Sequence, residues 1–299
     1  IWAGGGGDIG WCLLMLALTL MALTLPELRL IPAQTGPATL PALAMKGKAG
    51  WPPCPVRLAF GAVAVSTLGL FMATMGRPES ALFAMAGLAG LAIVLLLWAE
   101  KAEGLDDLSL LPSAGLIAAI AAAPGVWSQL FGQFDLADLA SRPPETAPSG
   151  IASILLVMAG LVSAAHAYRA LRPGPWGVAF GLAAVLVAPV AAAVLELWWQ
   201  PARVLGPYLW GLHLIALAAL MTGLALHFAK VDAGNMRRAA QATLSAMALI
   251  ALALFVLTTK TALTLALAVL VVVAAALDRR YRLPEMSLFL QVGSAVLGY

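Results

Sequence analysis

Apolar stretches about as long as a bilayer is thick recur along most of this chain. A helix needs roughly 17 to 25 such residues to cross the hydrocarbon core of a membrane. These stretches are apolar on every side and lack the alternation of polar and apolar residues that a membrane β-strand shows. The pattern predicts an all-α integral membrane protein with about ten transmembrane helices, the last of them truncated.

The composition agrees with this class. Hydrophobic residues make up 62% of the 299 residues and charged residues only 10%, whereas soluble domains are nearer half apolar and a quarter charged. So few charges would not cover a water-exposed surface. The net charge of +3 is too small to indicate nucleic-acid binding, and the partner that the composition predicts is the lipid bilayer.

We treat residues 1–299 as a single polytopic region. The missing Met at position 1 and the short final run predict a fragment of a longer protein. Its expected spans are Ile9–Leu25, Leu58–Met75, Ala81–Ala99, Pro112–Phe131, Ile151–Tyr168, Trp176–Trp199, Tyr208–Phe228, Ala242–Leu257, Thr261–Leu277 and a tenth from Met286.

Two connections between these spans are long. Residues 26–57 are Pro-rich, and within them the apolar residues 28–45 leave a re-entrant or short spanning segment open as an alternative. Residues 131–150 are expected to contain a short helix at the membrane surface. Proline interrupts two expected spans, at Pro124-Gly125 and at Pro189, and we expect a kink at the first.

The distribution of Lys and Arg predicts the orientation. Thirteen of the 17 lie in the first, third, fifth, seventh and ninth connections, which therefore should be cytoplasmic by the positive-inside rule. The N-terminus and the connection 131–150 are then periplasmic, and Cys12 and Cys54 lie toward opposite faces. The main topology anchors are Arg237, Arg238, Arg279, Arg280 and Arg282.

Ionisable side chains inside a span are costly and indicate functional sites. Glu196 and His213 lie about one turn from the outer ends of two consecutive spans, and Arg203 lies between them. Together they form a candidate polar cluster that could move protons or bind a small polar ligand. The alternative is structural: a carboxylate that reaches water or pairs with Arg203, and a histidine bonded to a backbone carbonyl.

Other ionisable residues favour structural interpretations. His166 and His227 are expected to contact headgroups or water at the inner face, and the adjacent Asp106 and Asp107 are expected to be solvated. No metal-ligand spacing is present among the three histidines and two cysteines. We therefore expect no metal, no cofactor and no assignable catalytic residue.

One segment carries a resemblance. Residues 260–285, from Lys260-Thr261-Ala262 through Asp278-Arg279-Arg280-Tyr281-Arg282-Leu283-Pro284-Glu285, resemble the bacterial membrane protein family called domain of unknown function 2339. Tyr208-Leu209-Trp210-Gly211-Leu212-His213 is similar to that family as well. The resemblance implies the bacterial inner membrane and a longer parent chain, and it brings no catalytic residues.

Three functions remain open at this stage. The first, which we rank highest, is a polytopic inner-membrane protein with a structural or envelope-associated role and no enzymatic activity. The second is a transporter or flippase of a small or lipid-linked solute, built on the two interrupted spans. The third is an intramembrane enzyme that acts on a lipid-linked substrate through Glu196, Arg203 and His213.

Overall fold

The computed structural model describes residues 5–44, 50–76, 78–122, 150–172, 174, 176–232 and 236–258, together with isolated positions beyond 258. Every regular element among them is a helix. Seven of these helices are long and apolar enough to cross a membrane, and an eighth, Ile9–Thr24, is shorter. The structure is therefore that of a helical, multi-pass membrane protein. The count of about ten stays a prediction, because the ninth and tenth expected spans lie almost wholly outside the described residues.

The chain divides into two compact units. Unit 1 comprises Ile1–Asp135 and Val157–Gly177, and unit 2 comprises Leu136–Leu156 and Val178–Tyr299. The helix α8 (Gly150–Ala170) contributes its first residues to unit 2 and the rest to unit 1.

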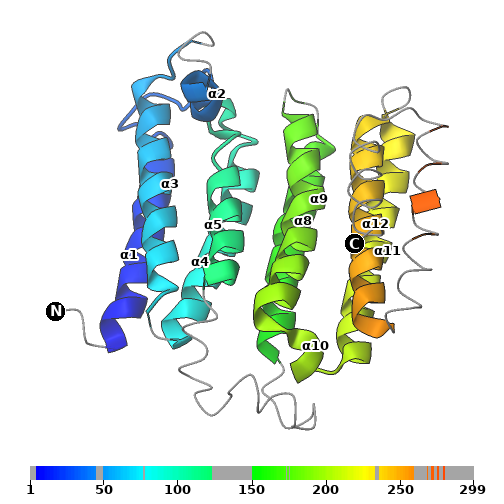
Figure 1. Cartoon of the computed structure of the whole chain (residues 1–299). Helices are drawn as coiled ribbons and strands as arrows, with labels where there is room; N and C mark the ends of the chain where they lie inside the picture. The colour runs from blue at the N-terminus through cyan, green and yellow to red at the C-terminus, as the bar shows by residue number, and fades with distance from the viewer. Residues whose placement is uncertain are drawn as a thin grey trace. The chain divides into compact units, whose positions relative to one another are not determined.

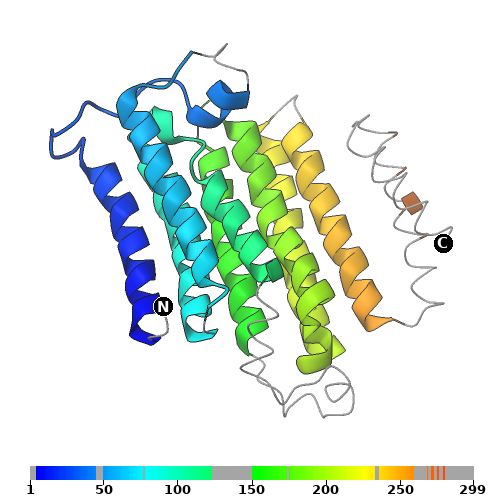
Figure 2. The same cartoon turned by 60° about the vertical axis from the view of Figure 1, so that its left-hand side comes forward.

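Four long helices form most of unit 1 (Figure 1). They are α1 (Gly5–Thr24), α3 (Cys54–Ala73), α4 (Pro78–Trp98) and α5 (Leu110–Ala122). Both α1 and α5 pack against α3 and α4, and α1 and α3 lie side by side in both views (Figure 2).

Small and polar residues hold α1 against α3. The Thr19 hydroxyl donates a 2.8 Å hydrogen bond to Ser66 Oγ, which donates a 2.6 Å bond to the Met15 carbonyl. A Cβ at Gly69 would lie 2.6 Å from Met15 Sδ, so any other residue there would require the Met15 side chain to shift. Such contacts replace the hydrophobic effect, which does not drive helices together in lipid.

In residues 26–44 and 50–53 of the Pro-rich connection, which the structure describes, the one regular element is α2 (Thr39–Ala44). Six residues of helix are roughly 9 Å long, which is far shorter than a bilayer. Residues 28–44 therefore form no spanning helix, and the re-entrant alternative stays a prediction. The helix α3 begins at Cys54, four residues before the expected start, because Pro55 suits the first turn of a helix.

Unit 2 contains α9 (Gly177–Val194), α10 (Pro201–Val204), α11 (Pro207–Val231) and α12 (Arg237–Leu257). The helices α11 and α12 run side by side over much of their length (Figure 1). The Ser245 hydroxyl donates a 2.6 Å hydrogen bond to the Val185 carbonyl, which ties α12 to α9.

Pro189 does not interrupt its helix as expected. Pro189 lies inside α9, which continues without a break to Val194. The irregularity comes later, in the π-helical segment η3 (Leu195–Trp199), and ends at Gln200 with a left-handed φ of 48°. Pro124-Gly125 and the expected surface helix of residues 131–150 lie outside the described residues.

Candidate functional site

Three connections of unit 1 meet at one end of its helices. Gly104, in the short helix η1 (Glu103–Leu105), donates its backbone N–H to the Gln34 carbonyl at 3.2 Å. The C-terminal end of α8 contributes the side chains that complete this region. We call the residues Asp106, Asp107, Ser113, His166 and Arg169 the loop-end cluster. It joins sequence segments that the topology prediction had assigned to one face of the membrane.

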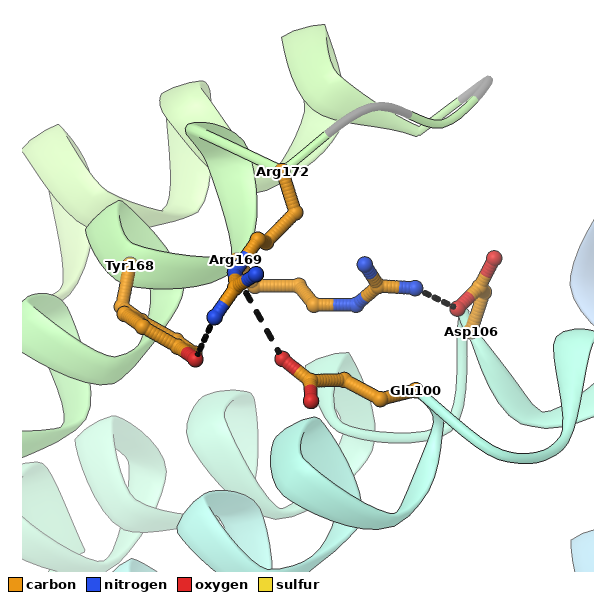
Figure 3. A network of polar contacts seen from close by, with 5 residues as sticks. All are labelled: Glu100, Asp106, Tyr168, Arg169 and Arg172. Atoms are coloured by element: carbon orange, nitrogen blue, oxygen red, sulfur yellow. Dashed lines mark hydrogen bonds and ion pairs between the residues drawn. The ribbon is translucent and has the colours of Figure 1, made fainter.

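An ion pair forms the centre of the loop-end cluster. Arg169 Nη2 donates a 2.9 Å hydrogen bond to Asp106 Oδ1 (Figure 3). The side chains are only 11% and 5% exposed. Because water has so little access to this pair, both charges have lost most of their solvation, and each depends on the other for stabilisation.

Asp107 connects this region to α2. Its side chain is fully buried, and Oδ2 accepts a 2.5 Å hydrogen bond from the backbone N–H of Leu40. Leu40 is the second residue of α2, where backbone N–H groups lack helical partners and favour a negative charge. Oδ1 has no hydrogen-bond partner among the described residues.

His166 lies behind the ion pair and is also fully buried. The Ser113 hydroxyl donates a 2.8 Å hydrogen bond to the Ser109 carbonyl. Ser113 Oγ is therefore free to accept from His166 Nε2, which lies 2.9 Å away. This contact joins α8 to α5 one turn below the Asp106–Arg169 pair.

Exposed pairs surround the loop-end cluster. The guanidinium of Arg172 donates to the Tyr168 hydroxyl and lies 3.9 Å from Glu100 Oε1 (Figure 3). Lys101 Nζ lies 3.9 Å from Glu27 Oε1. These solvated pairs contribute little to stability.

The sequence interpretation of these residues was wrong in two places. Asp106 and Asp107 are 4% and 0% exposed, not solvated. His166 does not contact headgroups or water, whereas His227 is exposed. One feature of the sequence could have indicated this burial. Arg169 lies at the end of a predicted span, at the same predicted face of the membrane as the two aspartates.

The predicted polar cluster of Glu196, Arg203 and His213 lies in unit 2. Glu196 is in the π-helical segment η3, Arg203 is exposed on α10, and His213 is in the second turn of α11. The groups next to the Glu196 carboxylate are the Ala202 backbone, the Trp210 indole and the Arg203 guanidinium. Glu196 Oε2 and Trp210 Nε1 are both buried and form no well-aligned hydrogen bond with any described residue.

Trp210 lies between Glu196 and His213 in the predicted polar cluster. Its ring stacks on His213 with the centroids 5.8 Å apart. His213 Nδ1 lies 2.8 Å from the Leu209 carbonyl and therefore carries the proton, which leaves Nε2 to accept from Ser153 Oγ at 3.2 Å. His213 thus makes the backbone contact that its structural interpretation predicts. Sequence reasoning missed Trp210 and Ser153, because neither is ionisable.

The topology anchors have different environments. Arg237 is exposed at the start of α12. Arg238 pairs with Asp232, lies 4.9 Å above the ring of Phe228 and packs its stem against Gly181. Arg279 is exposed, and Arg280 and Arg282 lie outside the described residues.

The part of the chain that the structure describes holds no group of three or more His, Cys, Asp or Glu side chains that could bind a metal ion. Known protein families, curated proteins and solved structures all lack a match to this chain, so its function is argued from its own residues.

Proposed function

We propose that this chain is part of an inner-membrane protein with a structural or envelope-associated role, from the bacterial family that residues 208–213 and 260–285 resemble. In this proposal the odd connections face the cytoplasm and the N-terminus faces the periplasm. The observation that carries the structural role is the loop-end cluster: its buried charges are used to join three connections to one another.

The position of the buried charged side chains distinguishes the structural role from transport. A transporter needs polar groups that line a path toward the middle of the membrane. The most buried ion pair described here, Asp106 with Arg169, lies instead at the ends of helices. Pro189 also lies in an unbroken part of α9, which removes one of the two interruptions that favoured a transporter.

The experiment is a deletion of the full-length parent gene, complemented with variants of the same protein. We expect Glu196→Ala and His213→Ala to restore growth and envelope integrity as well as wild type. Asp106→Ala should lower the amount of folded protein in the membrane, and complementation should fall in proportion. Loss of complementation by Glu196→Ala at a normal protein level would contradict the structural role.

A second function, an enzyme acting on a lipid-linked substrate at the outer face, has one specific observation in its favour. Glu196 Oε2 is buried without a well-aligned hydrogen bond to any described residue, and Glu196 belongs to a π-helical segment. Such segments are frequent at functional sites. Under this proposal Glu196→Gln, which preserves the shape of the side chain, would lose the ability to complement the deletion. Arg172→Ala would retain it, because Arg172 is exposed and is distant in sequence from Glu196.

A further inference from the structure

An apolar groove of about 350 Å³ runs between α1 and α4 in unit 1. Leu16 and Leu20 form its α1 wall. The α4 wall includes Phe83, Gly87, Gly90 and Val94. This volume is at the lower end of the range for ligand pockets, and an apolar lining of this kind suits a hydrocarbon chain rather than a polar solute.

Glycine creates the space in this groove. A Cβ placed on Gly90 would meet no heavy atom within 4 Å, so the position opens onto unfilled space. A Cβ on Gly87 would lie 3.3 Å from Leu70 Cδ2 and 3.7 Å from Leu16 Cδ1, so that glycine forms the floor. A larger side chain at position 90 would occupy the groove without displacing its walls.

Two opposite charges lie beyond the end of α4 on the side of the groove that Val94 lines. Positions 87, 90, 94 and 98 follow one another at helical spacing, and α4 ends at Trp98, one turn beyond Val94. Lys101, in the turn after α4, places its Nζ 5.6 Å from the centroid of the Trp98 ring. The turn that follows α1 brings Glu27 Oε1 to 3.9 Å from Lys101 Nζ.

The pair of Lys101 and Glu27 is well placed to exchange its contact for a ligand. Its side chains are 70% and 53% exposed, and 3.9 Å is too long for a good hydrogen bond. An exposed pair of this kind contributes little, so little is lost when each member binds an outside group. The ammonium attracts a phosphate, and the carboxylate attracts an amine.

We propose that this groove binds one aminophospholipid of the bilayer, with an acyl chain between α1 and α4. Its phosphate contacts Lys101 and its ethanolamine ammonium contacts Glu27. Trp98 is the last residue of α4, and amphipathic rings favour the membrane interface. The site is independent of the functional proposals above and requires only that unit 1 is embedded in a membrane.

The test measures binding of phosphatidylethanolamine to the purified chain in detergent by native mass spectrometry. Wild type should bind one lipid molecule. Gly90→Leu should weaken binding by about tenfold, because it displaces the contacts of about two methylene groups. The matched control is Gly61→Leu, since Gly61 is also an exposed helical glycine whose Cβ would meet nothing within 4 Å, but it lies on α3 outside the groove.

A second variant keeps the acyl-chain site testable if Gly90→Leu fails to fold. Leu20 is 45% exposed, so Leu20→Trp should fold and narrow the groove from the α1 side. Circular dichroism and thermal unfolding report on folding for each variant. Equal lipid affinity in wild type, Gly90→Leu and Leu20→Trp would overturn the proposed acyl-chain site.

The proposed headgroup contacts are tested separately, by comparing the binding of two phospholipids. Wild type should prefer phosphatidylethanolamine to phosphatidylglycerol, because only the former offers an amine to Glu27. Glu27→Gln should abolish this preference, and Lys101→Gln should weaken the binding of both lipids. Wild-type binding without any preference, or a preference that survives Glu27→Gln, would overturn the assignment.

Discussion

Arg169 Nη2 and Asp106 Oδ1 lie 2.9 Å apart although their residues are 63 positions apart in the chain. The contact joins the end of α8 to the connection between α4 and α5. It also brings together two groups of charge that the sequence had placed in separate loops at one face. The surrounding contacts of Asp107 and His166 extend the same link to α2 and α5.

Breaking this ion pair should destabilise the protein strongly. In Asp106→Ala a guanidinium that is 11% exposed loses its carboxylate, and a buried charge without its partner typically costs about 3 to 5 kcal/mol. We expect a clear drop in the unfolding temperature in detergent. Asp106→Ala combined with Arg169→Met should recover part of the loss.

The matched control for this prediction is Arg172→Ala. Arg172 is three residues away on the same turn and pairs with Glu100 in solvent, so its removal should change the unfolding temperature far less. Equal effects of Asp106→Ala and Arg172→Ala would show that the buried pair has no special role.

Gly104 should not tolerate a side chain. A Cβ there would lie 2.6 Å from Val56 Cγ2 and 3.0 Å from the Gln34 carbonyl oxygen, which is backbone and has little room to move. Overpacking of this kind costs about 1 to 3 kcal/mol, so Gly104→Ala should lower stability by that amount in a denaturant titration.

Gly160→Ala provides the comparison for Gly104→Ala. A Cβ at Gly160 would meet no heavy atom within 4 Å, and alanine favours a helix more than glycine does. The variant should therefore be neutral or slightly stabilising. A loss of stability in Gly160→Ala would point to a contact with residues that the structure does not describe.

Ser66 should contribute through its two hydrogen bonds between α1 and α3. Ser66→Ala removes the acceptor of Thr19 and the donor to the Met15 carbonyl. Hydrogen bonds between helices in lipid contribute about 0.6 kcal/mol each, up to nearly 2, and the same range of destabilisation is expected in unfolding experiments. Thr222→Ala is the control, because among the described residues the Thr222 hydroxyl bonds to the Ala218 carbonyl of its own helix.

The two cysteines test the orientation without any new mutation. Neither cysteine is in a disulfide; Cys12 is buried and Cys54 is exposed. A membrane-impermeant maleimide should label Cys54 in inverted inner-membrane vesicles and not in intact spheroplasts, because its connection is predicted to be cytoplasmic. Cys12 should react only after unfolding in detergent. Labelling of Cys54 in intact spheroplasts would reverse the predicted topology.

The positions of the helices could be predicted well from the sequence. The helix-forming runs are set by local composition and by the length that a bilayer requires, and prolines such as Pro26 and Pro207 place helix ends through their own backbone geometry. These properties depend on neighbours in the chain, so the fold class follows from the sequence alone. The course of α9 through Pro189 is the exception, because neighbouring backbone and packing accommodate a proline in lipid.

The environment of the polar residues was decided only by the tertiary structure. Asp106 and Asp107 are adjacent in a charged loop and look solvated, yet they are buried because Arg169 and the start of α2 reach them from distant parts of the chain. The same holds for Glu196 and His213, because the Trp210 ring stacks on His213 and its indole lies next to the Glu196 carboxylate. Burial and partnership depend on which segments meet in space, and a sequence pattern read along the chain does not contain that information.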